Sequence, residues 1–333
     1  MEEFLKSAVA ARAIASALEL GVIDYLLARP DAERGALAAD LRIERGGLGL
    51  LCDLLSASGV CEEEEGRLRL SEAFRKALGY RDLLEAKLDF GALAFPDYLG
   101  GLTPLIAAPE EFRRRSRMFR LFDYGRCWDF SPESEALTRR WMRITTALTR
   151  YESAACLAQY DVGRHRRLLD IGGNSGEFAL QVCRRNPELR ATVVDLPLVC
   201  RIGRAHVARE PEGPRIAFVE GNALADPLPG GFDLVSFKSV LHDWPEKDAQ
   251  HLIQQASGSL EKGGTLLIFE RGPFEVDEAG VPYSVIPFLL FFRSFRPPAW
   301  YKVRLETMGF REVTIRRIDL EMPFFLVTGV KGP

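Results

Sequence analysis

The segment from Leu168 to Asp195, LLDIGGNSGEFALQVCRRNPELRATVVD, constrains the fold more than any other part of the chain. Its pattern predicts, in order, a buried strand over 167–171, a glycine-rich turn over 172–176, a helix over 177–185 and a second strand over 191–194. The turn alone could be a tight connection and nothing more, but the carboxylate of Asp195 at the end of the second strand favours a nucleotide-binding unit. We expect the glycines to let the backbone approach a ligand, and Asp195 to accept hydrogen bonds from two ribose hydroxyls.

The rest of the carboxy-terminal half continues as strands whose ends carry polar side chains. We expect strands over 216–219, 232–237, 265–269, 312–317 and 324–330, with a helix over 248–260 and a turn over 261–264. Asn222, the run from Lys238 to Trp244, and Glu270 follow three of these strands. Open α/β sheets bind ligands beyond the carboxyl ends of their strands, so this half predicts one doubly wound sheet with its site at that edge.

The amino-terminal half is mostly helical. Helices over 4–27, 35–39 and 47–55, followed by a hairpin over 60–63 and 68–70, are typical of a winged helix, although a plain helical cap is an alternative. The third helix lacks exposed Arg, Lys or Asn for reading base edges, which favours a protein interface over DNA binding. Residues 71–120 should be helical, interrupted at Phe95-Pro96 and Gly100-Gly101, and a long helix should cover 133–158.

Composition excludes several classes of protein. The formal net charge of -3 and the lack of a long basic tract argue against a nucleic-acid partner, and we interpret the run Arg113 to Arg117 as a solvated helix face. The six cysteines are far apart and form no CxxC pair, so neither a disulfide framework nor a zinc site is expected. The amino terminus differs from a signal peptide, and no apolar run reaches the ~20 residues of a membrane span. We therefore expect a cytoplasmic protein with no membrane partner.

Five motifs, in this order and spacing, resemble those of the class I S-adenosylmethionine-dependent methyltransferases: LLDIGGNSGEFAL, VVDLP, FVEGNAL, SFKSVLHDWPEKDAQHLI and LEKGGTLLIFE. The closer resemblance is to the small-molecule O-methyltransferases of the plant caffeate type and their bacterial relatives. ELGVIDYLL and DFSPESEALTRRWM also match, so nearly the whole chain is covered. The resemblance implies an α/β Rossmann-like methyltransferase domain over 161–333, doubly wound and mostly parallel with an antiparallel terminal strand. It further implies a mainly α, winged-helix dimerisation domain over 1–95 that forms a homodimer, and a helical linker with substrate-pocket helices over 96–160.

The resemblance also implies roles for individual residues. His242 aligns with the catalytic base, Glu270 with the carboxylate that orients it, and Asp243 with the neighbour of the base. The cofactor, S-adenosyl-L-methionine, which leaves as S-adenosyl-L-homocysteine, should contact Asp170, Gly172, Gly173, Gly176, Asp195, Leu196, Asn222, Ala223, Lys238 and Trp244. Methyl transfer from a sulfonium needs no metal, because the leaving thioether is neutral. The reaction needs a hydroxyl held in line with the methyl–sulfur bond, and a base that removes its proton. A histidine, with an ordinary pKa of about 6.5, can serve as that base near neutral pH.

An apolar wall should bind the acceptor, a small molecule lying between the domains. Its expected members are Phe130, Trp128, Met142, Phe288, Phe292 and Phe295, although aromatic residues at such spacing also commonly form core. The chain departs from the family at three places. Asn222 stands where aspartate is usual, and Ala223 replaces a larger side chain. The stretch Ser294 to Trp300, SFRPPAW, stands where a glycine-rich segment usually supplies a second orienting carboxylate.

These observations favour methyl transfer to a hydroxyl of an aromatic or polycyclic small molecule in secondary metabolism. One alternative is methylation of carbon, on an α-keto acid or a ring position, and another is a non-methylating protein that binds the same cofactor. Some relatives that methylate keto acids bind a metal through the His-Asp pair and a further histidine. No third histidine lies in the right region here, so no metal is expected. We expect His251 to be structural, and His165 and His206 to lie at the surface.

Overall fold

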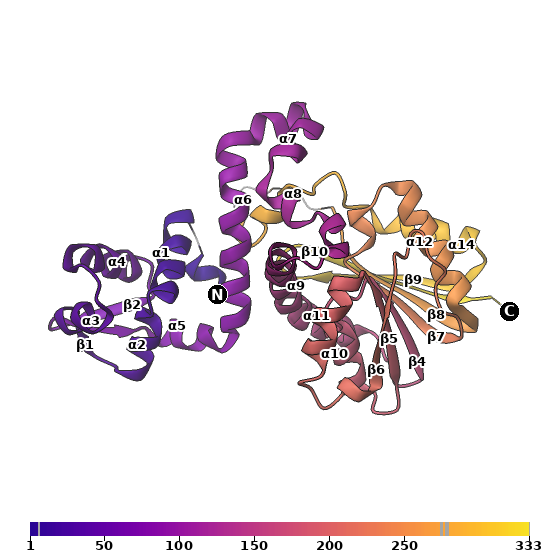
Figure 1. Ribbon diagram of the computed structural model, residues 1–333, viewed down its shortest axis with the longest axis horizontal. Helices are drawn as coiled ribbons and strands as arrows, with labels where there is room; N and C mark the ends of the chain where they lie inside the picture. The colour runs from indigo at the N-terminus through magenta and orange to yellow at the C-terminus, as the bar shows by residue number, and fades with distance from the viewer. Residues whose placement is uncertain (6, 274–275, 277–279, 333) are drawn as a thin grey trace. The chain divides into compact units, whose positions relative to one another are not determined.

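The computed structural model describes residues 1–5, 7–273, 276 and 280–332, and the chain forms two compact units (Figure 1). The first comprises Met1–Met118 with Val276–Leu290, and the second comprises Phe119–Glu275 with Phe291–Pro333. Each unit has its own apolar core, built around side chains such as Ile14 and Phe74 in the first and Phe237 in the second. The three-part division expected from the sequence stays a prediction.

The first unit begins with helices and a small antiparallel sheet. Its elements are η1 (Glu2–Phe4), α1 (Ala8–Glu19), α2 (Val22–Ala28), β1 (Ala32–Glu33), α3 (Arg34–Leu41), α4 (Arg45–Ala57), β2 (Cys61–Glu64) and β3 (Arg67–Leu70). The helical prediction and the hairpin are confirmed. The segment 4–27, expected to form one or two helices, forms α1 and α2, with Gly21 (φ 76°) between them. Strand β1, too short for a sequence pattern, adds to the hairpin in the order β1-β3-β2.

Helices fill the rest of this unit. They are α5 (Glu72–Ala77), η2 (Leu78–Tyr80), α6 (Arg81–Ala107), α7 (Pro109–Arg115), α8 (Arg117–Leu121), which runs into the second unit, and α13 (Ile286–Leu289). The predicted interruptions at 95–96 and 100–101 are wrong, because α6 continues through Pro96 and Pro104. Proline removes a helical hydrogen bond at a cost of ~3 kcal/mol. Contacts with distant segments offset this cost: Tyr98 donates to the carbonyl of Ile286 at 2.6 Å, and the buried Asp97 carboxylate receives the backbone N–H of Met118 at 3.0 Å.

The second unit is built on a seven-stranded sheet in the order β6-β5-β4-β7-β8-β10-β9. The strands are β4 (Arg167–Ile171), β5 (Arg190–Asp195), β6 (Ile216–Glu220), β7 (Phe232–Lys238), β8 (Leu260–Arg271), β9 (Phe310–Asp319) and β10 (Pro323–Lys331). Of these strands β10 alone is antiparallel, to both β8 and β9. The predicted mostly parallel, Rossmann-like sheet with an antiparallel terminal strand is therefore confirmed.

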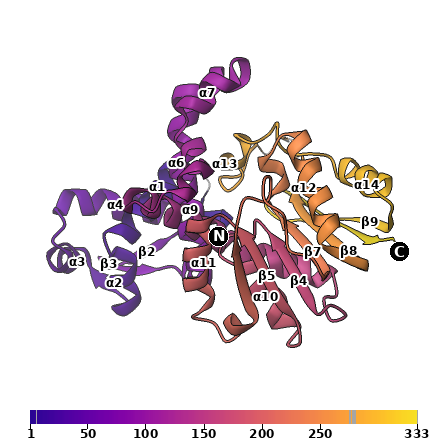
Figure 2. The same ribbon diagram turned by 45° about the vertical axis from the view of Figure 1, so that its right-hand side comes forward.

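Helices cover both faces of this sheet. They are α9 (Pro132–Gln159), α10 (Glu177–Arg185), α11 (Pro197–Val207), α12 (Glu246–Ser259) and α14 (Pro298–Thr307), joined by the short turns η3 (Tyr124–Trp128), η4 (Gly213–Arg215) and η5 (Leu241–Asp243). Figure 2 shows α9, α10 and α11 on one face and α12 and α14 on the other. No helix in the described part of the chain is both long and apolar enough to cross a membrane.

The turn expected over 261–264 is part of strand β8. Pairing with β7 skips from Phe232 opposite Leu260 to Leu234 opposite Thr265, so the intervening residues bulge out of the ladder. Gly263 has a φ of 78°, a conformation that glycine adopts without a steric penalty. The glycine signal was correct, but it marks a bulge within a strand rather than a separate turn.

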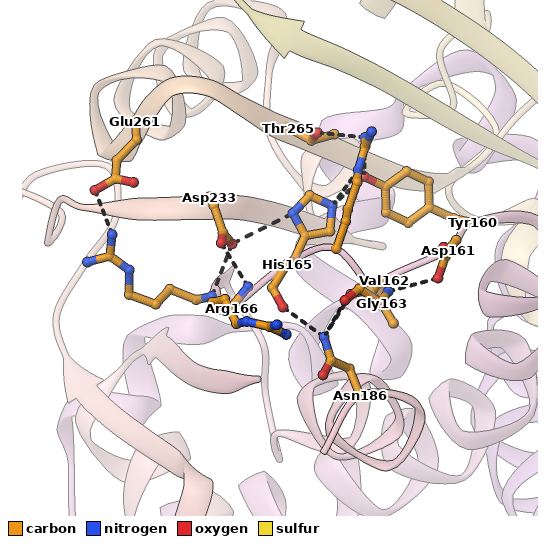
Figure 3. Close-up of polar contacts among 12 residues, drawn as sticks. Tyr160, Asp161, Val162, Gly163, His165, Arg166, Asn186, Asp233, Glu261 and Thr265 are labelled. Carbon is orange, nitrogen blue, oxygen red and sulfur yellow. Dashed lines mark hydrogen bonds and ion pairs between the residues drawn. The ribbon is translucent and has the colours of Figure 1, made fainter. Parts of the chain in front are cut away.

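A polar cluster fixes the connection between α9 and β4 (Figure 3). His165, expected at the surface, is 4% exposed; its Nε2 lies 2.8 Å from the hydroxyl of Tyr160, and its Nδ1 lies 3.6 Å from Asp233. Asn186 donates to the carbonyl of His165 at 2.7 Å. That surface expectation is wrong because these partners lie up to 68 positions away along the chain, counting from His165 to Asp233. His206 is partly exposed, as expected of a surface position, and its Nε2 lies 2.8 Å from Oε2 of Glu177.

Candidate active site

The glycine turn lies at the carboxyl end of β4 and leads into α10. Gly172 and Gly176 have φ values of 66° and 78°, and Asn174, which has a side chain, is also left-handed at 55°. A Cβ on Gly173 would lie 2.4 Å from Oδ2 of Asp170, which no real side chain tolerates. The turn therefore needs glycine for its backbone angles at two positions and for space at a third.

Asp195, at the end of β5, is held in a fixed orientation by backbone amides. Its Oδ2 accepts from the N–H of Asn174 and its Oδ1 from the N–H of Leu196, both at 2.8 Å. Burial raises the pKa of Asp195 to about 6. Each carboxylate oxygen retains a further lone pair, so the side chain can still accept the pair of ribose hydroxyls expected from the sequence.

Asp170 lies beneath the same turn and is 1% exposed. Its Oδ1 accepts from the hydroxyl of Ser236 at 2.6 Å, whereas its Oδ2 has no hydrogen-bond partner among the described residues. Burial raises the pKa of Asp170 to about 7. A buried carboxylate oxygen without a donor, directly under a glycine turn, fits a cationic ligand group such as the ammonium of an amino acid.

His242 and Glu270 meet where β7 and β8 end. Nδ1 of His242 lies 2.5 Å from Oε2 of Glu270, while Oε1 of Glu270 accepts from the N–H groups of Val240 and Leu241 at 2.7 Å each. His242 is 8% exposed. Burial lowers its pKa, but the charges of Glu270 and Asp243 outweigh burial, and the pKa of His242 is raised overall.

Asp243 completes the group of three catalytic residues predicted from the sequence. Its Oδ1 lies 3.5 Å from Nε2 of His242, and its Oδ2 accepts from the hydroxyl of Tyr124 at 2.7 Å. Burial raises the pKa of Asp243 above its ordinary value. Tyr124 is a site residue that the sequence reasoning missed, because its partner is 119 positions away. Its one signal was a place in the aromatic stretch DYGRCWDFS.

Lys238 does not present a free ammonium to the glycine turn. Its Nζ binds the carboxylate of Glu152, on α9, and the hydroxyl of Thr149 at 2.9 Å. Glu152 also binds Arg271, which donates to the hydroxyl of Ser239 at 2.9 Å. Burial lowers the pKa of Lys238 and opposes ionisation of Glu152, but the two cations outweigh burial and hold the pKa of Glu152 below its usual range. This buried ion group ties α9 to the strand ends.

Asn222 and Ala223 occupy the loop after β6. The side-chain oxygen of Asn222 accepts from the N–H of Leu224 at 3.0 Å, and its backbone N–H donates to Asp226 at 2.7 Å. Ala223 packs against the core of the unit. The side-chain oxygen at position 222 therefore already shapes this loop, and it has one lone pair left for a ligand.

The aromatic residues expected to bind the acceptor lie in different surroundings. Trp128 and Phe130 are 52% and 49% exposed, and Arg201 lies 4.8 Å from the ring of Phe130. Met142 and Phe295 are buried, and the ring of Phe295 lies 5.5 Å from that of His242.

The remaining two expected wall residues have other neighbours. Phe292 is exposed beneath Arg293, at 4.3 Å, and Phe288 belongs to the first unit, where it packs on Phe90.

A connected series of rings leads to the predicted catalytic residues. Neighbouring centroids lie 5.1–6.4 Å apart in the order Phe119, Phe291, Phe122, Trp141, Tyr124, Trp244, which we call the aromatic series. Such spacing is typical of favourable edge-to-face and tilted contacts. Tyr124, the fifth ring, donates its hydroxyl to Asp243, so the series reaches the predicted catalytic residues.

No cluster of His, Cys, Asp and Glu suited to holding a metal ion occurs among the residues that the structure describes. The site consists instead of a glycine turn, two fixed aspartates, and a histidine paired with a glutamate. Such an arrangement can hold a cationic nucleoside-like ligand and remove a proton beside it.

Comparison with known families agrees with this geometry. Residues 107–280, more than half of the chain, match the family model described as the O-methyltransferase domain. The chain belongs to this family, and it is an S-adenosylmethionine-dependent methyltransferase.

Individual relatives give the same picture. The chain is 29% identical to 3-hydroxy-5-methyl-1-naphthoate 3-O-methyltransferase of Streptomyces sahachiroi, over 77% of this chain and 72% of that protein. It is 34% identical to acetylserotonin O-methyltransferase of Bos taurus over 56% of this chain and 54% of that one. Among solved structures, an O-methyltransferase from neocarzinostatin biosynthesis, in complex with S-adenosylmethionine and 2-hydroxy-5-methyl naphthoic acid, has the same fold. Its TM-score is 0.70, with 20% identity over 99% of this chain and 98% of that one.

Proposed function

We propose that the protein transfers the methyl group of S-adenosylmethionine to a hydroxyl of an aromatic or polycyclic small molecule, with His242 as the general base. The observation that carries the proposal is the pairing of His242 with Glu270 at strand ends in the same sheet as the glycine turn. Relatives that act on a naphthoate and on acetylserotonin support an aromatic acceptor.

When bound, the cofactor would supply a methyl group attached to a positively charged sulfur. Transfer of the methyl group breaks the carbon–sulfur bond, and the sulfur leaves as a neutral thioether. In our proposal the residues of the glycine turn receive its amino-acid part, and Asp195, with Leu196, receives the ribose. The unpartnered Oδ2 of Asp170 supports this assignment, because a buried carboxylate oxygen gains most from a cationic donor such as an ammonium group. Asn222, Ala223 and Trp244 are proposed to contact the adenine. Lys238 is proposed to act indirectly, since its ammonium is bound by Glu152.

The pairing with Glu270 determines which nitrogen of His242 acts as base. A carboxylate can only accept a hydrogen bond, so the proton of the neutral imidazole is on Nδ1 and the lone pair is on Nε2. Nε2 takes the proton of the acceptor hydroxyl while the hydroxyl oxygen gains the methyl group. Glu270 then stabilises the resulting imidazolium, as the raised pKa of His242 indicates.

The aromatic series supports a flat acceptor. It offers ring faces and edges on α8, η3 and α9 that lead toward Asp243 and His242. Such surfaces bind planar apolar molecules and leave a few polar groups to select orientation. We therefore propose Phe122, Trp141 and Phe295 as acceptor-contacting residues, in addition to Met142.

Substitution of the base tests the proposal. His242→Ala should reduce kcat for methylation of a phenolic acceptor by ~10²–10⁴, the usual contribution of a general base. Calorimetric binding of S-adenosylmethionine should persist, because His242 is not assigned to the cofactor. The matched control is His251→Ala, an exposed histidine on α12. Full activity of His242→Ala, or a product methylated on carbon, would refute the proposal.

We also propose a homodimer formed through the first unit. Leu99, Leu102 and Ile106 are spaced to share one face of α6 and are 88%, 50% and 62% exposed. An apolar stripe of this kind is typical of an interface. Light scattering should give twice the mass of one chain, and the double variant Leu99→Glu with Ile106→Glu should give the mass of one. The cytoplasmic location stays a prediction from the sequence.

A further inference from the structure

We propose that Arg296 is a positioning residue for methyl transfer, holding the turn that carries His242. The inference rests on the proposed role of His242 as base. It concerns the segment Ser294 to Trp300, which departs from the family and was expected to be part of the acceptor wall.

The guanidinium of Arg296 joins the two ends of the turn from Leu241 to Trp244, which we call the catalytic turn. Its Nη1 donates to the carbonyl of Leu241 at 2.8 Å, and its Nη2 donates to the carbonyl of Trp244. These carbonyls flank His242 and Asp243. The turn η5 is only three residues long, and the backbone hydrogen bond between the two ends of the catalytic turn runs from the N–H of Trp244 to the carbonyl of Leu241, at 3.3 Å. A planar guanidinium has donors at fixed spacing and can hold both carbonyls at once.

The backbone around Arg296 is itself rigid. Pro297 and Pro298 follow directly, and Pro298 begins α14. Tyr301 and Leu305 anchor that helix in the core, where they are 1% and 0% exposed. The guanidinium also lies 5.0 Å from the ring of Trp300. Arg296 therefore links the catalytic turn to a fixed helix.

The same segment also packs on the imidazole. Phe295, adjacent to Arg296, is 6% exposed and lies 5.5 Å from the ring of His242. Glu270 holds Nδ1 from strand β8, and its other oxygen receives the amides at the start of the turn. Glu270 thus fixes the beginning of the turn, Phe295 packs on the ring, and Arg296 joins the carbonyls at either end of the turn.

Loss of Arg296 should act on catalysis rather than on cofactor binding. Without the guanidinium, the 3.3 Å backbone bond from Trp244 to Leu241 remains to join the two ends of the turn, so the turn loosens and Nε2 loses its alignment with the acceptor oxygen. A misplacement of ~1 Å can cost about 10²-fold in rate. We expect Arg296→Gln to lower kcat by roughly 10- to 100-fold, and to change the KM for S-adenosylmethionine by less than about twofold.

Arg304→Gln is the matched control. Arg304 lies 3.6 Å from the same Trp300 ring, but it binds Glu246 and the carbonyl of Trp300 rather than the catalytic turn. Both variants remove a guanidinium from Trp300, and only the change at Arg296 removes the link to the turn. Arg296→Lys keeps the charge and should fold even if Arg296→Gln does not. It should lose kcat too, because one ammonium cannot reproduce the fork.

The assay combines kcat and KM with ¹⁵N NMR titration of the histidine side chains, assigned by comparison with His242→Ala. We expect the variants at Arg296, and not Arg304→Gln, to lose kcat and to shift the titration of His242 toward that of an ordinary histidine, as its contact with Glu270 loosens. Wild-type kcat in a folded Arg296 variant, or an equal loss in Arg304→Gln, would overturn the inference. If no acceptor is methylated, the proposed function fails, and the NMR titration alone still decides whether Arg296 positions the imidazole.

Discussion

His242 and Glu270 are bound through a single 2.5 Å contact between Nδ1 and Oε2, made from a turn to the end of a neighbouring strand. The second oxygen of Glu270 binds the backbone of the same turn, at the amides of Val240 and Leu241. One carboxylate therefore orients both the imidazole and the peptide that carries it. This double role makes Glu270 the most informative position for substitution.

Glu270→Gln should lower kcat by roughly 10² or more, because the uncharged amide no longer stabilises the imidazolium. It should also change the pH profile. The pKa of His242 is raised by Glu270, so the wild-type rate falls as the pH drops through that raised value. Removing the charge lowers the pKa, and the acidic limb should move to lower pH. Glu261→Gln, at the exposed other end of β8, should leave the profile unchanged; an unmoved limb in Glu270→Gln would contradict the assignment.

Cofactor affinity should depend on pH through Asp170. The pKa of this carboxyl is raised to about 7 by burial, so it becomes charged as the pH rises through that value. A cationic ammonium binds the charged form better, and the Kd for S-adenosylmethionine should therefore fall from about pH 6 to about pH 8. Asp170→Asn should bind more weakly and lose most of this dependence, as measured by calorimetry. The exposed Asp161→Asn is the control, and an equal pH slope in both variants would exclude Asp170 as the source.

Glu152→Gln should destabilise the second unit by about 3 kcal/mol, since it leaves Lys238 and Arg271 as buried cations without their counter-charge. Urea unfolding measures the loss. Glu135→Gln, on the same helix but with exposed partners Arg139 and Arg201, should cost much less. Equal losses in the two variants would show that the buried ion group adds nothing to stability.

The cluster around His165 should make stability depend on pH (Figure 3). Burial lowers the pKa of His165 in the folded protein below its ordinary value of about 6.5. The unfolded chain therefore binds the proton more readily than the folded chain. The stability that neutral His165 contributes is fully present above about pH 6.5 and is lost as the pH falls below that value. His165→Gln should flatten the fall in unfolding free energy between about pH 6.5 and pH 5, whereas the exposed His251→Gln should not.

The sequence predicted the helices and strands that are determined by residues close together along the chain. The strand Arg167–Ile171 and the helix Glu177–Arg185 have the predicted bounds, because both follow from periodicity and a glycine turn. The continuous helix α6 was not predictable, since what offsets Pro96 is a set of contacts with segments far along the chain. Tyr98, for example, binds Ile286, 188 positions away.

The site divides in the same way. His242, Asp243 and Glu270 follow strand ends in a recognisable motif, and the structure brings them together. Tyr124 and Arg296 carry no such signal. Tyr124 contacts Asp243 from 119 positions away along the chain, and Arg296 contacts Leu241 from 55 positions away. Only the fold reveals those contacts. The stretch SFRPPAW contains one expected wall residue, Phe295, whose role stays a prediction, and its arginine binds the carbonyls of Leu241 and Trp244.

The placement of β10 has a consequence for how the enzyme matures on the ribosome. Strand β8 carries Glu270, and its partner on one side is β10, in which Phe325 lies opposite Glu270. Synthesis proceeds from the amino terminus, so β8 emerges long before β10 and remains an edge strand until residues 323–331 have been added. The carboxylate of Glu270 therefore gains its final support only when β10 pairs with β8. A nascent chain stalled before that point would present an open β edge to chaperones and to other chains.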